Sequence, residues 1–311
     1  MKHLFVINPT AGKTDRSHEI RAEIEELARE MGFPCEIILT RGPMDAADIV
    51  QRAAGQGDEL RVYACGGDGT LNEAVNGAAG YPHVAVTQYP TGSGNDFIRI
   101  FGKDTSRFSD LRELVEGETA EFDLIDCNGR LCLNICSVGL DARIAAGMQS
   151  FKKLPFLSGR GAYALSTLYH VLRGISRPYE AEVDGRHFSG DFTMLVAASG
   201  RYYGGGMYVM PEAEPDDGRI EFLLVRKVTV LKVAEVIGDY KTGNYRRHPD
   251  LATHLTGKEM AILSREGRTA INIDGEVMMS REVRLSLSPR KIRFIFPRGA
   301  RWESTFFADP I

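Results

Sequence analysis

Residues 60–79 read LRVYACGGDGTLNEAVNGAA and contain the stretch that decides the fold, Gly66–Glu73. The apolar run Leu60–Cys65 has the composition of a buried strand, and the pattern from Thr70 to Ala79 is helical. Glycines in the turn between them permit positive φ and close backbone approach, so successive N–H groups can point at a phosphate. The helix N-terminus adds partial positive charge at the same point. The stretch therefore predicts a strand, an anion-binding turn and a helix.

Two further glycine-rich segments follow predicted strands in the same way. Asn8–Lys13 (NPTAGK) follows the run Leu4–Ile7, and Pro90–Asp96 (PTGSGND) follows the run Val84–Thr87. One such loop has the composition of an ordinary turn. Three at the carboxyl edge of one parallel sheet favour a nucleotide site, because ligands of open α/β sheets bind at that edge. The candidate binding residues are Asn8, Pro9, Thr10, Ala11, Gly12, Gly66, Gly67, Asp68, Gly69, Thr70, Leu71, Asn72, Glu73, Ser93, Asn95 and Asp96.

The two halves of the chain differ in their pattern. Up to about residue 100, short apolar runs alternate with helical segments, which is typical of βαβ units around a parallel sheet. From about Glu121 the pattern is one of short alternating strands, typical of an antiparallel sandwich or barrel. We therefore expect an α/β nucleotide-binding lobe over 1–120 and a mainly antiparallel β-sandwich lobe over 121–296. The polar stretch Gly102–Glu118 is predicted to link them, and the tail 297–311 is expected to pack on the first lobe.

The individual elements follow from the apolar periodicity, which is 3.6 residues for helices and two for half-buried strands. The predicted helices are 17–31, 45–54, 70–79, one that begins near 95, 161–172 and 230–241. Besides the runs named above, the predicted strands are 36–39, 180–188, 192–198, 220–225, 260–263, 270–273 and 283–287.

Asp68 distinguishes its loop from a simple phosphate cradle. Neither G-x-x-x-x-G-K-[ST] nor G-x-G-x-x-G occurs in the three loops, which excludes the standard P-loop and dinucleotide fingerprints. A carboxylate beside phosphates repels them unless a cation bridges the two. We therefore expect a metal-bound nucleotide.

The composition excludes several classes of protein. Against 42 Asp and Glu stand 38 Lys and Arg, and the net charge of −4 argues against broad nucleic-acid binding. No apolar run approaches the length of a membrane span and no signal-peptide core is found, so we expect a cytoplasmic protein. Five cysteines, an odd number, fit reduced thiols, and Cys127, Cys132 and Cys136 lack the CxxC spacing of a metal site.

The strings NPTAGK, GGDGTLNE and PTGSGNDF, followed by PEAEPDDG and IDGE, resemble the diacylglycerol kinase catalytic-domain family, particularly its soluble bacterial lipid kinases. The resemblance covers nearly the whole chain, and GGDGTLNE is a highly specific part of it. It implies an α/β nucleotide-binding lobe followed by a β-sandwich lobe, with ATP and Mg²⁺ in the cleft between them. The ATP contacts that it implies are Asn8–Gly12, Thr40, Gly67–Glu73 and Ser93, where family members usually carry Thr.

The acidic stretch Pro211–Arg219 carries four carboxylates in PEAEPDDGR. Such a stretch is either a solvated turn closed by Asp-Gly or a source of hard oxygen ligands for magnesium or calcium. The resemblance implies the second, with a structural magnesium ion bound by the Asp217 side chain and by the carbonyls of Glu214 and Arg219.

The stretch Asn272–Glu276 reads as a hairpin turn on its pattern alone, since Asp-Gly stands between apolar residues. The resemblance implies that it is the second half of the active site. A lipid hydroxyl attacks a γ-phosphate poorly unless a carboxylate accepts its proton. Asp274 or Glu276 is the candidate base, and Asp68 completes the catalytic candidates; the sequence does not separate the first two.

Two stretches are candidates for contact with lipid. Between Ala142 and Tyr179 there is no Asp or Glu, and the basic residues there fit either anionic headgroups or a helical hairpin with snorkelling side chains. Arg201–Tyr208 fits either a flexible rim around an acyl chain or core packing. The basic residues of the first stretch are Arg143, Lys152, Lys153, Arg160, Arg173 and Arg177.

These observations predict an ATP- and magnesium-dependent kinase that phosphorylates a lipid hydroxyl, most simply that of diacylglycerol, to give phosphatidic acid. The alternatives are a kinase of phosphatidylglycerol or a sphingoid base, an NAD kinase, whose family also carries GGDGT, and a non-catalytic nucleotide sensor. The expected partner is a lipid substrate at the inner face of the membrane, contacted transiently. We expect no nucleic-acid partner and leave a homodimer open.

Overall fold

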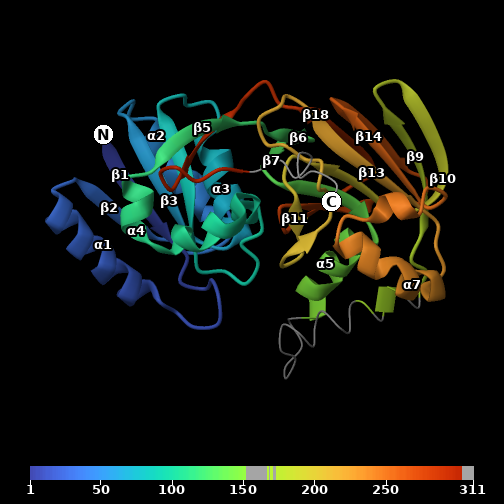
Figure 1. Cartoon of the computed structure of the whole chain (residues 1–311), viewed down its shortest axis with the longest axis horizontal. Helices are drawn as coiled ribbons and strands as arrows, with labels where there is room; N and C mark the ends of the chain where they lie inside the picture. The colour runs from blue at the N-terminus through green and yellow to red at the C-terminus, as the bar shows by residue number, and fades with distance from the viewer. Residues whose placement is uncertain (152–166, 168, 171–172, 303–311) are drawn as a thin grey trace, which may run out of the picture. The chain divides into compact units, whose positions relative to one another are not determined.

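The chain divides into two units in the computed structural model, which describes residues 1–151, 167, 169–170 and 173–302 (Figure 1). Unit 1 comprises Met1–Leu124, Tyr202–Gly206 and the chain from Ser288 onward, and unit 2 comprises Ile125–Arg201 and Met207–Leu287. The predicted combination of an α/β lobe with a parallel sheet and an antiparallel β lobe is confirmed.

Unit 1 is built on a six-stranded sheet in the order β2-β1-β3-β4-β19-β5. Neighbouring strands from β2 to β19 run parallel, and only the edge strand β5 is antiparallel to its neighbour β19. The side chains of β1, β3 and β4 are almost all buried, as expected for parallel strands covered on both faces. The strands are β1 (Lys2–Ile7), β2 (Cys35–Leu39), β3 (Leu60–Gly66), β4 (Val84–Pro90), β5 (Glu118–Phe122) and β19 (Ile292–Phe296).

The helices of unit 1 include α1 (Ser17–Met31), α2 (Asp45–Ala54) and α3 (Asp68–Ala78). The predicted bounds of the first two are confirmed, and α3 begins two residues earlier than predicted. In α1 the buried positions recur at helical spacing, and the helix ends where Gly32 adopts φ 72°, the left-handed conformation that glycine tolerates best.

The predicted linker over 102–118 is wrong, because this stretch belongs to unit 1. It contains most of the kinked 3₁₀ segment η1 (Phe97–Ser109) and the short helix α4 (Leu111–Val115). Charged residues are the commonest in its composition, but its apolar residues are buried, Phe108 and Leu114 fully so. The stretch was predicted as a linker because its average composition is polar, although it is an amphipathic segment.

The predicted lobe boundaries differ from the two units because the chain returns to unit 1 at Ser288. Residues 292–296 were assigned to the second lobe from the sequence, with no strand predicted there; they form β19, which inserts between β4 and β5. Its aromatic residues join a cluster in which Trp302 contacts Phe101, Phe122 and Phe296. The tail therefore packs on unit 1 as far as Trp302, and residues 303–311 lie outside the described part of the chain.

Unit 2 is a curled antiparallel sheet whose central strand is β10 (Arg186–Ala198). The first half of β10 pairs with β9, and its second half lies between β8 and β13. A register shift at Phe192–Met194 bends the strand between the two pairings. The predicted single strand 180–188 is wrong: Asp184 and Gly185 have positive φ and form the hairpin turn that joins β9 to β10.

The other strands of unit 2 form this sheet in the order β17-β16-β8-β10-β9-β15-β18-β6-β7, with β13 and β14 branching from β10. They are β6 (Ile125–Cys127), β7 (Arg130–Cys132), β8 (Ile135–Gly139), β9 (Arg177–Val183), β13 (Ile220–Arg226), β14 (Ala252–Gly257), β15 (Glu259–Ser264), β16 (Thr269–Ile273), β17 (Glu276–Ser280) and β18 (Glu282–Leu287). The short strand β12 (Met207–Tyr208) lies outside this sheet, and the short strand β11 (Tyr202–Tyr203) belongs to unit 1.

The helices of unit 2 are α5 (Leu140–Phe151), α7 (Val230–Lys241) and the 3₁₀ turn η2 (Tyr245–Arg247). The bounds of α7 are those predicted, whereas most of the predicted helix 161–172 lies outside the described residues. None of the described helices combines the length and the apolar character that crossing a membrane requires. All five cysteines are free, and Cys127, Cys132 and Cys136 lie in the core of the sheet, as expected for buried apolar side chains.

Burial of His3 makes the stability of unit 1 depend on pH. Its ring is 3% exposed, its Nδ1 lies 2.8 Å from the Tyr63 hydroxyl, and burial, with Arg61 nearby, lowers the pKa of His3 to about 4. In the unfolded chain the pKa is 6.5, so stability is fully present above that pH and is lost as the pH falls towards 4. We predict a loss of up to about 3 kcal/mol over this window.

The measurement is urea unfolding followed by the fluorescence of Trp302, the only tryptophan, which reports on unit 1. His3→Leu removes the titrating group and should flatten the dependence between pH 6.5 and 4. The same steep dependence in that variant would mean that another group causes it.

Candidate functional site

The three glycine-rich loops of unit 1 lie at one edge of its sheet. The parallel register pairs Ile7 with Leu39 and with Cys65, and Gly66 with Pro90, so these strands end at one level. Asn8, Thr40, the Gly66–Thr70 turn and the Thr91–Asp96 loop therefore follow neighbouring strand ends. The sequence-based expectation that the loops share an edge is confirmed.

Asn8 links the first loop to the second. Its backbone N–H donates to the Cys65 carbonyl at 2.9 Å, and its side-chain Nδ2 donates to the Thr70 hydroxyl at 3.0 Å. Its Oδ1 accepts from both the N–H and the hydroxyl of Thr10. The Asn8 amide is thus used within the protein, and it fixes the spacing between the two loops.

The glycines are needed where the loops touch backbone to backbone. Gly12 has φ 83°, and a Cβ placed on it would lie 2.6 Å from the Thr91 carbonyl oxygen. A Cβ on Gly92 would collide with the Cα of Gly67. Because real side chains do not approach so closely, these positions bring the three loops together only with glycine.

Asp68 ties the second loop to the third. Its Oδ2 accepts the N–H of Asn95 at 2.8 Å, and its Oδ1 accepts the N–H of Asp96 at 2.6 Å. Gly94 lies against the same carboxylate, since a Cβ there would meet Oδ2. Asp68, expected from the sequence to bridge a metal, therefore has a structural partner in the neighbouring loop.

Asn95 and Asp96 hold the third loop from its far side. Asn95 has φ 52°, and its side chain donates to the Gly92 carbonyl and accepts from Gln88. Asp96 is 5% exposed, accepts the N–H of Gly205 at 2.8 Å and pairs with Arg99 at 3.3 Å. Both predicted binding residues thus support the loop with their side chains.

The end of the GGDGTLNE motif is buried at the start of α3. Glu73 is 8% exposed, and its carboxylate accepts the N–H groups of Met44 and Ala46 at 2.8 and 3.2 Å. These N–H groups belong to the first turn of α2, so a residue of α3 caps the neighbouring helix. Asn72 is also buried, and Thr70 is bound by Asn8.

Four groups of this edge are placed to meet a ligand. Ser93 and Thr10 are exposed, and the N–H groups at the start of α3 have no side-chain cap among the described residues. The buried Thr91 hydroxyl has no hydrogen-bond partner in the described part of the chain. A phosphate or nucleotide hydroxyl would fit this donor set. Sequence reasoning missed Thr91, although its place in PTGSGND was the available signal.

In unit 2, Asp274 organises the turn that the sequence offered as the second half of the site. The turn between β16 and β17 has positive φ at Asp274 and Gly275, the geometry of a two-residue hairpin. The Asp274 carboxylate accepts the N–H groups of Leu133, Asn134 and Ile135 at 2.7 to 3.0 Å. It thereby fixes the 132–135 segment that enters β8.

Cys132 is the fourth donor to the Asp274 carboxylate, with its Sγ at 3.0 Å from Oδ1. Burial, with the charge of Asp274 beside it, raises the pKa of the Cys132 thiol well above its ordinary value. The thiol therefore keeps its proton at neutral pH and donates it. With four donors around it, the Asp274 carboxylate is a structural acceptor.

Glu276, two residues further on, is in a different environment. It is partly exposed at the first position of β17, and its carboxylate has no hydrogen-bond or ion-pair partner among the residues that the structure describes. The structure thus separates the two carboxylates that the sequence left equivalent.

A further acidic residue near this turn is Asp141, at the start of α5. The Ser137 hydroxyl donates to its Oδ2, and Ser137 pairs with Asn272 on the neighbouring strand β16. Its Oδ1 is buried with no partner in the described residues, and burial raises the pKa of Asp141. Sequence reasoning missed this pair; its only signal was an aspartate directly after a strand, behind Gly139 with φ 129°.

The acidic turn carries an oxygen-rich donor set. Asp217 Oδ1 accepts the N–H of Arg219 at 2.9 Å, and Glu214 Oε2 pairs with the buried Arg201 at 2.8 Å. Within the described residues, no three His, Cys, Asp or Glu side chains converge to hold a metal. A site here would therefore depend on carbonyls, as the resemblance implied. The buried Glu214 Oε1, which lacks a partner in the described chain, fits a nearby cation.

In the basic stretch between Ala142 and Tyr179, Arg143 and Arg177 bind other parts of the protein, whereas Arg173 is exposed and lies over the Tyr169 ring. Arg143 donates to the carbonyls of Gly139, Gly174 and Ile175, and burial, with Arg177 nearby, lowers the pKa of its guanidinium. Arg177 pairs with Glu266 at 3.1 Å. These arginines bind protein, while Lys152, Lys153 and Arg160 lie outside the described residues.

The second predicted lipid contact, Arg201–Tyr208, is split between core and turn. Arg201 is 2% exposed and donates to the Ala213 carbonyl, and Tyr203 is 9% exposed. For these two residues the core-packing alternative is correct.

Comparison with known proteins gives a consistent result over both units. A family model described as "Diacylglycerol kinase catalytic domain" matches residues 2–127, and one described as "YegS C-terminal NAD kinase beta sandwich-like domain" matches residues 134–296. A Staphylococcus epidermidis protein named "Putative lipid kinase" is 24% identical over 284 residues, which cover 89% of this chain and 92% of that protein.

Solved structures share the fold. A crystal structure of a "putative diacylglycerol kinase" from Bacillus anthracis has a TM-score of 0.73 at 22% identity, over 96% of this chain and 98% of that chain. A second, described as a diacylglycerol kinase from the same organism, has a TM-score of 0.69 at 19% identity, with the same coverage. Fold and matches together define a two-domain kinase of the lipid kinase class. The chain belongs to the diacylglycerol kinase catalytic-domain family.

Loss of the Asp68 carboxylate should loosen the third loop. In Asp68→Ala the two N–H groups of Asn95 and Asp96 lose a charged acceptor, and we predict that unit 1 loses about 2 kcal/mol of unfolding free energy. The measurement is urea unfolding by Trp302 fluorescence. Asp58→Ala is the matched control, because Asp58 forms an exposed ion pair with Lys2 and should leave stability nearly unchanged. Equal stability of both variants would show that Asp68 does not hold the loop.

Proposed function

We propose that the chain transfers the γ-phosphate of ATP to the hydroxyl of a lipid, with diacylglycerol as the first substrate to test. The observation that carries the proposal is the edge of unit 1, where three glycine-dependent loops and the start of α3 present backbone N–H groups together. In a member of a lipid kinase family, that donor set suits the phosphates of a nucleotide.

The nucleotide side of the reaction would use mainly the backbone. The N–H groups at the start of α3 and the hydroxyls of Thr91 and Ser93 would bind and orient the phosphates. Asp68 would keep the third loop in register with the second. Its negative charge requires a cation when phosphates are bound, which supports magnesium as the companion of ATP.

The acceptor side would use Glu276. A general base needs an accessible lone pair within reach of the proton that it removes. Asp274 meets this requirement poorly because four donors surround it. Glu276 would take the proton of the lipid hydroxyl. The hydroxyl oxygen would then form a bond to the γ-phosphorus, while the bond between the γ-phosphorus and the bridging oxygen of the β-phosphate breaks and ADP leaves.

The acidic turn would hold a second magnesium ion, with a structural task. Asp217 and the carbonyls of Glu214 and Arg219 are the proposed ligands. Bound there, the ion would supply positive charge to a stretch with four carboxylates. The residues of the turn would then stay fixed at the start of β13, which Ile220 begins.

The name of one matching model, which refers to NAD kinase, favours a second candidate function. Both can be tested in one experiment with radiolabelled ATP, magnesium and separate acceptors: diacylglycerol, phosphatidylglycerol and a sphingoid base in mixed micelles, and NAD in solution. We expect labelled phosphatidic acid and no labelled NADP. Label on NAD alone would replace the lipid proposal, and ATP binding without transfer to any acceptor would favour a nucleotide sensor.

The roles of Glu276 and Asp274 should separate in this assay. Glu276→Gln removes a base that has no partner among the residues described by the structure, so we predict that turnover falls about 10² to 10⁴-fold while the melting temperature is kept. Asp274→Asn replaces an acceptor of four donors by an amide and should lower the melting temperature as well.

Glu282→Gln, an exposed glutamate in β18, is the matched control and should keep normal turnover. If Glu276→Gln also turns over normally, Glu276 is not the base. If Asp274→Asn alone loses turnover with an unchanged melting temperature, the two assignments must be exchanged.

A further inference from the structure

Helix α7 carries several large apolar side chains that are exposed to solvent. Leu231 is 86% exposed, Val230 51% and Ile237 37%, and Ala234 is exposed between them. At helical spacing these four residues share one face. No residue of α7 is fully buried, although its other face, with Val233 and Val236, is partly covered. The helix is therefore apolar on both sides, and its outer apolar face lacks a partner within the described chain.

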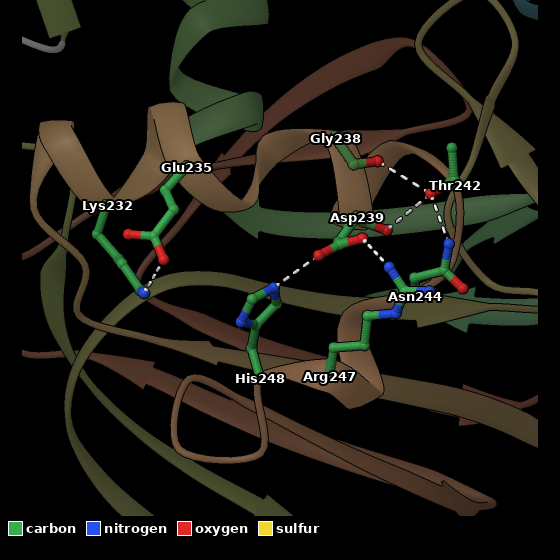
Figure 2. Close-up of polar contacts among 8 residues, drawn as sticks. All are labelled: Lys232, Glu235, Gly238, Asp239, Thr242, Asn244, Arg247 and His248. Carbon is green, nitrogen blue, oxygen red and sulfur yellow. Dashed lines mark hydrogen bonds and ion pairs between the residues drawn. The ribbon is translucent and has the colours of Figure 1, made fainter.

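The acidic charges of α7 are neutralised on its flank, away from this face. Figure 2 shows Glu235 paired with Lys232, and Asp239 bound by Arg247 and His248. The hydrogen bond from His248, with Arg247 beside it, holds the pKa of Asp239 below its ordinary value. Both carboxylates of the helix are thus paired locally.

The end of α7 is fixed to the turn that follows. The Thr242 hydroxyl donates to the carbonyls of Gly238 and Asp239, and Asn244 donates to the same hydroxyl (Figure 2). The Asn244 N–H also bonds the Asp239 carbonyl at 2.8 Å. These bonds, together with the ion pairs of Asp239, hold the helix in place, and none of the described residues covers its outer face.

The surroundings of the apolar face are basic. Residues 226–248 contain six Lys and Arg against two Asp and Glu, a surplus of four positive charges in a chain whose net charge is −4. Lys227, Arg246 and Arg247 are more than half exposed and pair with Asp191, Glu212 and Asp239. Asp191 and Glu212 lie outside this segment and offset two of the four charges, so a surplus of two remains, and Lys241 is exposed at the end of the helix. Apolar residues on one face with basic residues around them are the pattern of helices that lie in a membrane interface.

We propose that α7 is the membrane-docking helix of this protein, and that it lies on an anionic lipid surface with Val230, Leu231, Ala234 and Ile237 towards the acyl chains. Lys241, Arg246 and Arg247 then lie at the level of the headgroup phosphates. The positive surplus selects lipid over a protein partner, because it complements a uniformly negative surface. This inference rests on the proposed function for its lipid surface, but docking does not require turnover and can be measured separately.

The test is sedimentation of the full chain with vesicles of phosphatidylcholine containing phosphatidylglycerol, and with vesicles of phosphatidylcholine alone, at 0.05 and 0.2 M NaCl. Wild type should bind the anionic vesicles and release as salt rises. The double variant Val230→Ser, Leu231→Ser should bind at least about tenfold more weakly, since it removes two apolar side chains from the docking face. Lys241→Glu should also weaken binding, and only to the anionic vesicles.

Met44→Ser is the matched control, because Met44 is 44% exposed in unit 1 and should leave vesicle binding unchanged. Unchanged binding of the double variant, or failure of wild type to bind, would overturn the proposal. So would a double variant that changes from dimer to monomer in sedimentation velocity while its vesicle binding is kept, since a second copy would then cover the face.

Kinase activity in mixed micelles is measured in parallel: if vesicle binding behaves as predicted and no lipid is phosphorylated, only the proposed function fails.

Discussion

The hydrogen bonds between the Asp68 carboxylate and the N–H groups of Asn95 and Asp96 are the constraint on which the candidate site of unit 1 depends. The glycines bring the backbones of Gly67 and Gly92 into contact and offer no side chains, and the Thr91 N–H donates to the Gly66 carbonyl at the base of the loop. A charged acceptor between two loops gives this contact a fixed register. The N–H groups at the start of α3 then stay uncovered for a ligand.

Unit 2 uses the same device at its own turn. Asp274 accepts hydrogen bonds from the N–H groups of Leu133, Asn134 and Ile135, as Asp68 does from two N–H groups of the third loop. In both units an aspartate whose motif suggests a catalytic role instead holds a backbone segment in place by accepting its N–H groups. A residue can therefore be essential for activity without touching a reacting atom, and loss of turnover on mutation needs a stability measurement beside it. Glu276, which has no such partner in the described chain, remains the residue for which a chemical role is the simpler account.

The sequence predicted well wherever one local signal decided the structure. Helices α1 and α2 were predicted because apolar periodicity sets them, and the three loops because glycine composition and strand ends coincide. It failed where distant contacts decide. The stretch 102–118 looked polar because its charged residues outnumber the buried Phe108 and Leu114, and β19 could be placed in unit 1 only by its pairing with β4 and β5. The different environments of Asp274 and Glu276 depend on the 132–135 segment, which lies about 140 residues away in sequence.

The central claim, that the loops of unit 1 form the nucleotide site, is tested most directly by amide hydrogen exchange with and without ATP and magnesium. The account predicts slower exchange in 8–12, 66–70 and 91–96 at saturating nucleotide, with the protection lost when magnesium is removed. Protection confined to unit 2, or exchange in these three loops that saturating ATP and magnesium leave unchanged, would contradict it.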